Sequence, residues 1–150
     1  MPQSLANILV HLVFSTKDRA PLITSDVESE LHAYSSKVFE TCESPMIAIG
    51  GVEDHVHILF RLSRTKSMAQ IVETIKTDTS KWIKTKGTAY ARFHWQSGYG
   101  AFSVGPVDHE KVVRYIRSQR AHHQRKTFQE EYRELICRSG QELDEKYAWD

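Results

Sequence analysis

Residues 7–15, Asn-Ile-Leu-Val-His-Leu-Val-Phe-Ser, constrain the fold most strongly. Successive side chains of a β-strand point to opposite faces of the sheet. One face of this segment therefore carries only apolar side chains, namely Ile8, Val10, Leu12 and Phe14. The other face carries Leu9, His11 and Val13. A strand that is apolar on both faces, apart from one histidine, is typical of the centre of a sheet.

Three capping boxes, in which Ser or Thr precedes Glu or Gln by three residues, mark helix starts. They are Ser25 with Glu28, Ser67 with Gln70, and Thr127 with Glu130. Apolar residues at helical spacing follow each box and predict helices over 26–41 and 67–85, and a last helix that ends at Gly140. Asp108 is expected to cap a further helix that runs to about His123.

The remaining strands lie between these helices. The segment from Pro45 to Ile49, closed by Gly50-Gly51, predicts a second strand, and residues 55–62 predict a third that pairs with it as a hairpin. A short fourth strand is expected at 101–104.

The predicted order β-α-β-β-α-β-α-α is that of an α+β fold, a ferredoxin-like split βαββαβ core with an antiparallel sheet and additional C-terminal helices. We expect a single domain over residues 1–150, with a polar C-terminal tail at about 141–150.

The chain contains no long apolar segment. A helix that crosses a bilayer needs roughly 20 apolar residues, and the apolar runs here, such as Ile8-Leu9-Val10, are far shorter. No charged segment followed by a long apolar core indicates a secretory signal. Cys42 and Cys137 are far apart and form no C-x-x-C motif. We therefore expect free thiols, a cytoplasmic location and no membrane partner.

The charge is polarised along the chain. The formal charge of the whole sequence is +1, but residues 61–126 contain fourteen Lys or Arg and four Asp or Glu, which makes +10. The remaining residues carry −9. A basic segment of this size fits either a solvated surface or a polyanionic partner such as nucleic acid.

The sequence Asp54-His55-Val56-His57 is the sharpest chemical motif. Alternation puts His55 and His57 on one face of the third strand, where two imidazoles can bind one metal ion. We expect this face, which continues with Leu59 and Arg61, to be unsuited to interior packing of both rings. Asp54 fits either an orienting partner of His55 or an exposed turn residue.

Tyr115 and Gln119 are four residues apart in the predicted helix 108–123 and so lie on one side of it. A glutamine carbonyl is a ligand suited to Mg²⁺ or Mn²⁺. Spacing alone favours an ordinary amphipathic tyrosine and an ordinary helix-forming glutamine over a metal site.

These motifs together resemble those of the single-tyrosine HUH transposases of small bacterial insertion sequences, the IS200-like family. The resemblance rests on His55-Val56-His57, on the glycine-rich and aromatic segment from Trp95 to Val104, and on Tyr115-Ile-Arg-Ser-Gln119. It extends from the first strand to the last helix.

The resemblance implies a metal-dependent transposase of bacterial or archaeal cells. His55 and His57 would hold Mg²⁺ or Mn²⁺ with Gln119 as third ligand, and Tyr115 would be the nucleophile that forms a 5′-phosphotyrosine link. The segment 95–104 would support the site. His122 and His123 follow the helix, and we expect them in solvent.

The resemblance also implies partners. Single-stranded or hairpin DNA would be the substrate, and the basic segment supplies six candidate DNA-binding residues: Lys81, Lys84, Lys86, Arg92, Arg117 and Arg120. A homodimer is implied, in which the tyrosine helix of one subunit completes the metal site of the other.

Three other functions compete with this one. A domesticated HUH nuclease that acts on repeated hairpins would carry the same motifs. A non-catalytic module resembling the RNA-recognition motif would share the strand order, but it stacks bases on exposed aromatic residues, and the third strand offers His55, His57, Leu59 and Arg61 instead. A metal-dependent hydrolase of small molecules would leave the basic segment unexplained.

Overall fold

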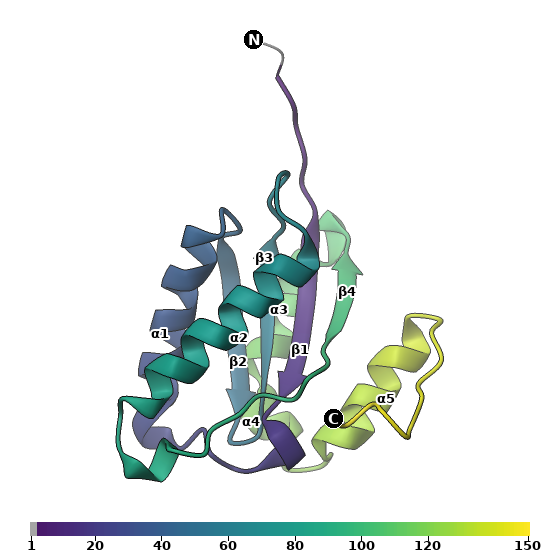
Figure 1. Cartoon of the computed structure of the whole chain (residues 1–150). Coiled ribbons are helices and arrows are strands. Elements are labelled where there is room, and N and C mark those ends of the chain that lie inside the picture. Colours follow the sequence, from purple (N-terminus) through teal and green to yellow (C-terminus); the bar gives the residue numbers. More distant parts are fainter. Residues whose placement is uncertain (1–2) are drawn as a thin grey trace.

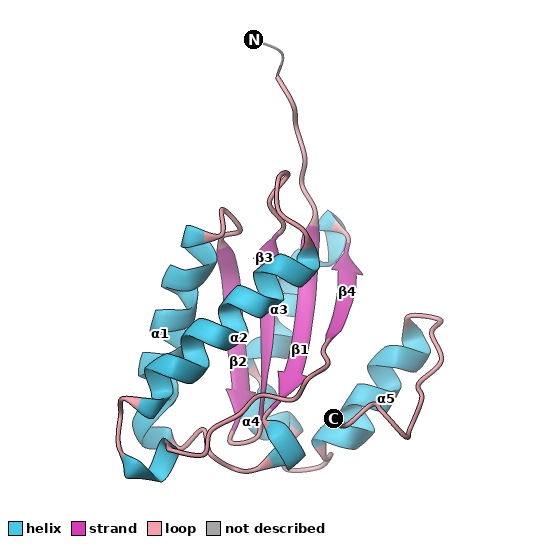
Figure 2. Cartoon of the chain, in the orientation of Figure 1, coloured by secondary structure: helices cyan, strands magenta, loops and turns pink. Residues whose placement is uncertain are grey.

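The structure is a computed structural model that describes residues 3–150. Four strands form one antiparallel sheet in the order β2-β3-β1-β4 (Figure 2). The strands are β1 (Leu9–Ser15), β2 (Met46–Val52), β3 (His55–Arg61) and β4 (Gly100–Val104). The predicted central strand, β1, lies between β3 and β4.

Helices cover both faces of the sheet (Figure 1). The first two, α1 (Ser25–Thr41) and α2 (Met68–Lys84), pack on one face, in front of the sheet in this view. The last three are α3 (His109–Arg117), α4 (Gln119–His122) and α5 (Phe128–Arg138). Short 3₁₀ turns lie at Lys17–Arg19, Thr88–Tyr90 and Pro106–Asp108. The predicted ferredoxin-like core with additional C-terminal helices is confirmed.

Alternate side chains of β1 point to opposite faces of the sheet and so contribute to separate apolar clusters. Val10, Leu12 and Phe14 face α1 and α2 in the largest apolar cluster. On the opposite face, Leu9 packs with residues of α3, and Val13 packs with residues of α5. The last three helices therefore share the sheet face on which His11 lies.

Helix boundaries follow the predictions with three differences. Ser67 and Gln70 form the predicted capping box of α2, and Thr127 accepts the predicted hydrogen bond from the backbone N–H of Glu130. By contrast, α1 begins at Ser25 itself, and Asp108 makes no side-chain capping bond to α3. The predicted helix over 108–123 is broken at Ser118, which separates α3 from α4.

Gly50 brings α3 close to the sheet. The predicted strand 45–49 continues through both glycines to Val52 as β2. A Cβ atom built on Gly50 would lie 2.1 Å from the carbonyl oxygen of Ile116 in α3. Only a residue without a side chain allows the helix backbone to approach so closely. Tyr115 directly precedes Ile116 in this helix.

The segment before β4 is anchored to two neighbouring elements. The ammonium group of Lys76 donates to the carbonyl oxygens of Gln96 and Gly98 at 2.7 and 2.6 Å, and the side-chain oxygen of Gln96 accepts from the backbone N–H of Ser15 at 2.7 Å. Trp95 donates its indole N–H to Thr79 at 2.9 Å. These bonds tie the predicted supporting segment to β1 and α2.

The C-terminal tail folds back onto this segment. Trp149 packs on the rings of Phe128 and Tyr132 of α5, with centroid distances of 6.5 and 5.7 Å. The carbonyl oxygen of Ala148 accepts from the side-chain amide of Gln96 at 3.3 Å. Residues 141–150, predicted as a polar tail, therefore brace α5. Among residues 3–150, no helix has the length and apolar character needed to cross a membrane.

Candidate metal centre

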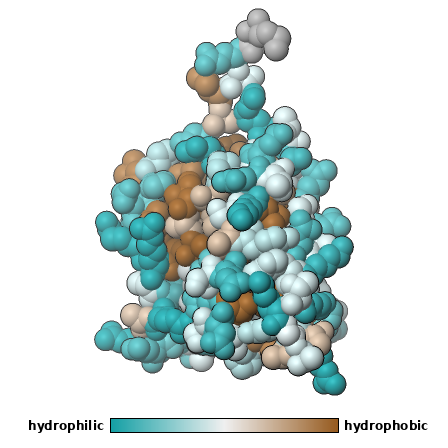
Figure 3. Space-filling model, turned by 90° about the vertical axis from the view of Figure 1, so that its left-hand side faces the viewer, coloured by the Kyte–Doolittle hydropathy of each residue, from teal (hydrophilic) through white to brown (hydrophobic). Residues whose placement is uncertain are grey.

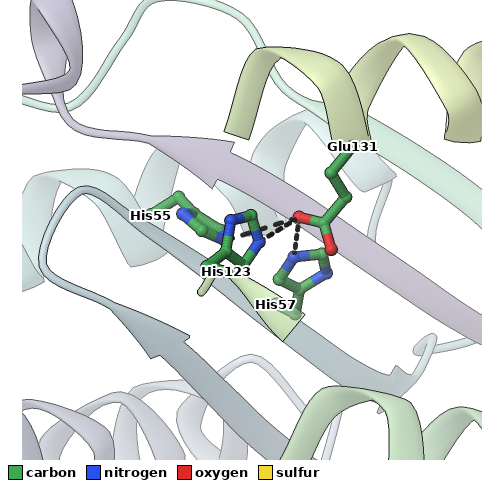
Figure 4. Close-up of side chains that lie close together, drawn as sticks. All are labelled: His55, His57, His123 and Glu131. Atoms are coloured by element: carbon green, nitrogen blue, oxygen red, sulfur yellow. Dashed lines mark hydrogen bonds and ion pairs between the residues drawn. The ribbon is translucent and has the colours of Figure 1, made fainter. Parts of the chain in front are cut away.

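Three histidines and one glutamate converge beside the sheet, and we call His55, His57, His123 and Glu131 the metal cluster (Figure 4). Their ligand atoms all lie within 4.8 Å of one another. His55 and His57 come from β3, His123 directly follows α4, and Glu131 comes from the first turns of α5. Segments far apart in the sequence thus meet at one point.

Both histidines of β3 are fully buried, at 0% exposure. This corrects our expectation that their face was unsuited to interior packing. The physical reason is that α4 and α5 cover this part of the sheet, which the pattern of β3 alone does not indicate. His123 is also nearly buried, with 7% side-chain exposure, so the expectation that it lies in solvent is wrong, while His122 is 27% exposed.

One oxygen of Glu131 is the centre of the cluster. Oε1 lies 2.8 Å from Nε2 of His57, 2.9 Å from Nε2 of His123 and 3.5 Å from Nε2 of His55. Glu131 is itself 1% exposed. The three imidazoles therefore present the same ring nitrogen to one buried carboxylate oxygen.

The outer ring nitrogens of the two β3 histidines have their own partners. Nδ1 of His55 lies 2.8 Å from Oδ1 of Asp54, and Nδ1 of His57 lies 2.8 Å from Nε2 of His11. Of the two roles that the sequence left open for Asp54, the structure favours that of orienting partner. Such outer contacts fix the ring orientation of metal-ligating histidines.

Burial and the carboxylates set the protonation of the cluster. Burial lowers the pKa of His55, but hydrogen bonds to Asp54 and Glu131 outweigh it and raise the pKa to about 9. Burial dominates at His57, whose pKa falls to about 4 despite Glu131. Hydrogen bonds from the imidazoles hold the pKa of Glu131 far below its usual range, against the effect of burial. Without a metal the cluster thus pairs a carboxylate with a protonated His55.

Tyr115 lies directly against this cluster within the same chain. Its hydroxyl donates a hydrogen bond to Oε2 of Glu131, and its ring lies 5.6 Å from the His57 ring. Burial, followed by the neighbouring carboxylate, raises the pKa of Tyr115. Without a metal the phenol therefore keeps its proton, which it donates in the hydrogen bond to the carboxylate of Glu131.

Gln119 also reaches the cluster. Its side-chain oxygen lies 3.3 Å from Nε2 of His55, and its amide donates to the carbonyl oxygen of Tyr115 at 3.3 Å. Although Ser118 interrupts the helix, Tyr115 and Gln119 remain on the same side. The structure therefore brings together all four residues that the resemblance assigned to the site: His55, His57, Tyr115 and Gln119.

The six candidate DNA-binding residues are distributed differently. Lys81 and Lys84 lie in the last turn of α2, which packs on the sheet face opposite the metal cluster. Lys86 follows α2, and Arg92 follows the 3₁₀ turn Thr88–Tyr90. Lys86 pairs with Glu30 at 2.8 Å. Arg117 is exposed at the end of α3, and Arg120 forms ion pairs with Glu28 and Glu53.

The sequence did not single out His11, His123 or Glu131 as site residues. A usable signal exists for Glu131, because it lies on the apolar stripe of α5 with Phe128, Tyr132 and Ile136, all of which are buried. A carboxylate on the buried stripe of a helix needs a cationic partner. No comparable pattern marks His123, which lies in the turn between two helices.

A pocket opens beside the cluster. It measures about 600 Å³. Asp54, His123 and Phe128 line it, together with the acidic Glu53 and three basic residues: Arg19, Arg120 and Lys126. Arg120 pairs with Glu28 and Glu53, and Lys126 pairs with Glu134. A polyanion that enters this pocket reaches the edge of the metal cluster.

The donor set fits a divalent metal ion. Imidazole nitrogens and carboxylate oxygens are ligands of Mn²⁺, Zn²⁺ and related ions. The buried carboxylate has only imidazoles as cationic partners among residues 3–150. A bound cation would take over the charge compensation that the proton on His55 provides.

Comparison with known proteins identifies the family of this chain. The family model described as "Transposase IS200 like" matches residues 4–119. A candidate transposase of Deinococcus radiodurans R1 superimposes with a TM-score of 0.62 at 17% identity, over 77% of this chain and 95% of that chain. A REP-associated tyrosine transposase bound to a REP hairpin superimposes with a TM-score of 0.56 at 14% identity. The match covers 77% of this chain and 68% of that chain. No match was found among the curated proteins. The family match covers most of the chain, and the protein therefore belongs to the IS200-like transposase family.

Proposed function

We propose that this protein cleaves and rejoins single-stranded DNA at the ends of an insertion sequence through a covalent phosphotyrosine link. The observation that carries the proposal is the position of the Tyr115 hydroxyl, which bonds to Glu131 within the metal cluster. A nucleophile, a cation site and a cationic pocket thereby lie side by side. Membership of a transposase family supports the same reaction class.

The reaction exchanges one phosphate ester for another. The oxygen of Tyr115 attacks the phosphorus, the bond from phosphorus to the 3′-oxygen breaks, and the DNA keeps its 5′-phosphate as an ester of Tyr115. The phenolic proton leaves the tyrosine, and one proton is taken up by the departing 3′-oxygen. Because the ester stores the bond energy, a second 3′-hydroxyl can reverse the step and join a new strand.

The residues of the chain prepare this attack. Glu131 accepts the hydrogen bond of Tyr115 and so fixes the direction of the phenolic oxygen. His55 and His57, with Gln119 as the third ligand that the resemblance implies, would hold the metal. When bound, Mg²⁺ or Mn²⁺ supplies polarisation of a non-bridging phosphate oxygen. The cationic rim of Arg19 and Lys126 would bind the adjacent phosphates.

Hairpin DNA is the proposed substrate. The solved REP-associated tyrosine transposase is bound to a REP hairpin, which also keeps the domesticated nuclease acting on repeated hairpins as a second candidate. Lys81, Lys84, Lys86, Arg92, Arg117 and Arg120 remain the proposed DNA contacts outside the pocket. A module of the RNA-recognition type fits less well, because helices cover both faces of the sheet here.

A homodimer is part of the proposal. Among the described residues β2 pairs only with β3, so its outer edge is free to join a second sheet. Figure 3 shows apolar side chains gathered on the side of the molecule where α1 and β2 lie. Sites shared between subunits would require exchange of the segment around α3, since Tyr115 reaches the cluster of its own chain.

The decisive experiment is a covalent trapping assay. Labelled single-stranded DNA with the hairpin end of the element is incubated with the protein and Mn²⁺ or Mg²⁺, then denatured and separated by electrophoresis. The wild type should form a protein–DNA adduct and Tyr115→Phe should form none. Tyr147→Phe, which changes an exposed tyrosine of the tail, is the matched control. An adduct that persists in Tyr115→Phe would exclude the assigned nucleophile.

Mixing two inactive variants tests the shared site. Tyr115→Phe lacks the nucleophile, and His57→Ala lacks a metal ligand. Adduct formation by the mixture would show that one chain supplies the tyrosine and another the metal. If the mixture stays inactive, each chain uses its own tyrosine, as the geometry of a single chain allows.

A further inference from the structure

We infer that Glu131 and His123 are metal ligands, so that this chain holds its ion with three imidazoles and one carboxylate. This deepens the proposed function, on which it rests for the purpose of the metal, but it concerns ligands that the resemblance does not supply. The family match ends at residue 119, before both residues. The C-terminal part of the chain would then complete the metal centre.

Convergence of the ring nitrogens is the first argument. Nε2 atoms of His55, His57 and His123 all approach Oε1 of Glu131, at 3.5, 2.8 and 2.9 Å (Figure 4). Together with Oε1 these nitrogens make four donor atoms within 4.8 Å of one another, from three different elements, which is the number that a four-coordinate ion takes.

The second argument is the charge of the site. Glu131 is buried, and within residues 3–150 no lysine or arginine pairs with it. A buried carboxylate is costly unless a cation offsets its charge. A divalent ion bound by three neutral imidazoles would carry two positive charges into the interior, and Glu131 would offset one of them.

Outer contacts provide the third argument. Asp54 holds Nδ1 of His55 and His11 holds Nδ1 of His57, both at 2.8 Å. The rings are thereby fixed with Nε2 toward Glu131. Gln119, in contrast, uses its oxygen on His55 and its amide on the backbone of Tyr115. In place of the ligand role that the resemblance implies, we assign Gln119 the role of joining the tyrosine turn to the cluster.

The second oxygen of Glu131 extends the inference to the nucleophile. While Oε1 faces the imidazoles, Oε2 accepts the hydrogen bond from Tyr115. One carboxylate would thus bind the metal and position the nucleophile. A set of three nitrogens and one oxygen favours Mn²⁺, Co²⁺ or Zn²⁺ over Mg²⁺, which prefers oxygen ligands.

Metal binding without DNA tests the inference. The full chain is stripped with EDTA and titrated with Co²⁺, and binding is followed by visible absorption and by calorimetry. Glu131→Gln and His123→Gln should each weaken Co²⁺ binding by more than about 100-fold, beyond the 10–100-fold typical of residues that only orient a ligand. Gln119→Leu should change it by less than about 10-fold.

Glu134→Gln is the matched control, because Glu134 lies on the same helix and pairs with Lys126 and with no residue of the metal cluster. Circular dichroism confirms that each variant is folded, and His123→Gln keeps the test open if Glu131→Gln does not fold. Wild-type affinity in both variants, with loss in Gln119→Leu, would overturn the assignment. A Tyr115 adduct that fails to form while Glu131-dependent Co²⁺ binding persists would contradict the proposed function alone.

Discussion

His11 and His57 are hydrogen-bonded across the sheet although the strand register does not place them opposite each other. His11 is paired with Leu59 and Val13 with His57, yet Nε2 of His11 lies 2.8 Å from Nδ1 of His57. Without a metal, Nε2 of neutral His57 donates to Glu131, so Nδ1 accepts from His11. A metal ion on Nε2 would require the opposite direction, with His57 donating to His11. The pair can adopt both arrangements because each imidazole has two tautomers.

Removal of the His11 imidazole, the hydrogen-bond partner of His57, should weaken metal binding. His11→Leu leaves Nδ1 of His57 buried without a hydrogen bond, and we expect Mn²⁺ affinity to fall about 10–100-fold. His11→Gln, whose amide can donate and accept, should retain more affinity than His11→Leu. Calorimetric titration of the two variants checks this, with the exposed His94→Gln as control. Equal affinity of His11→Leu and wild type would show that His11 does not orient His57.

His11 should also make the stability of the metal-free protein sensitive to acid. Burial, together with His57, lowers the pKa of His11 to about 3. In the unfolded chain a histidine takes up a proton near pH 6.5. Below that pH the unfolded state binds a proton at this histidine and the folded state does not. The free energy of unfolding therefore falls as the pH is lowered.

One such group contributes a slope of at most about 1.4 kcal/mol per pH unit. His11→Leu should remove this contribution and flatten the stability profile between pH 6 and pH 4. Urea unfolding in EDTA at several pH values measures it. Parallel profiles for His11→Leu and wild type would argue that His11 does not stay neutral in the folded protein.

Metal removal should destabilise the protein. An ion that binds only the folded state at about 100 times its dissociation constant stabilises it by about 2.7 kcal/mol. We therefore expect Mn²⁺ to raise the melting temperature and EDTA to reverse the effect. Glu131→Gln should lose the Mn²⁺-dependent increase while Glu134→Gln keeps it. An increase of the same size in Glu131→Gln would point to a metal site elsewhere.

Lys76 should prove important for stability despite its charge. Its ammonium group donates to backbone carbonyls of the segment before β4. Lys76→Met leaves these acceptors unpaired, and we expect a loss of about 1.5–3 kcal/mol in the free energy of unfolding. Lys81→Met, an exposed lysine of the same helix, should change it by less than about 0.5 kcal/mol. Urea unfolding of both variants measures the difference.

A side chain at Gly50 should disturb the tyrosine. The added methyl group of Gly50→Ala would clash with the carbonyl of Ile116, so α3 must move outward. We expect a destabilisation of about 1–3 kcal/mol together with slower adduct formation by Tyr115. Gly98→Ala, where the nearest atom lies 3.9 Å away, is the control. Unchanged stability and adduct formation in Gly50→Ala would show that α3 has room at this contact.

Local pattern was sufficient to predict most of the fold. Alternation in residues 7–15 identified the central strand, and the capping box at Ser67 located the start of α2. Alternation in residues 55–62 also put His55 and His57 on one face of the sheet. These features depend on neighbours along the chain, which the sequence displays directly.

The local sequence pattern could not predict which residues meet in the site. Glu131 is 74 residues from His57, and its place depends on how α5 packs over Val13. The turn that carries His123 gives no periodic signal. The burial of β3 on both faces was missed for the same reason, because the helices that cover it come from the C-terminal third of the chain.

The register of β3 against β1 decides more than stability. A slip of one residue would turn Val56, Ile58 and Phe60 toward Glu131 and put the two imidazoles among the apolar residues under α1 and α2. Such a chain could retain much of its secondary structure but would have no imidazoles beside Glu131. With the proposed metal site, ion binding would therefore be an assay of correct strand pairing, and a preparation that refolds in the wrong register should be separable from the native one by its failure to bind the ion.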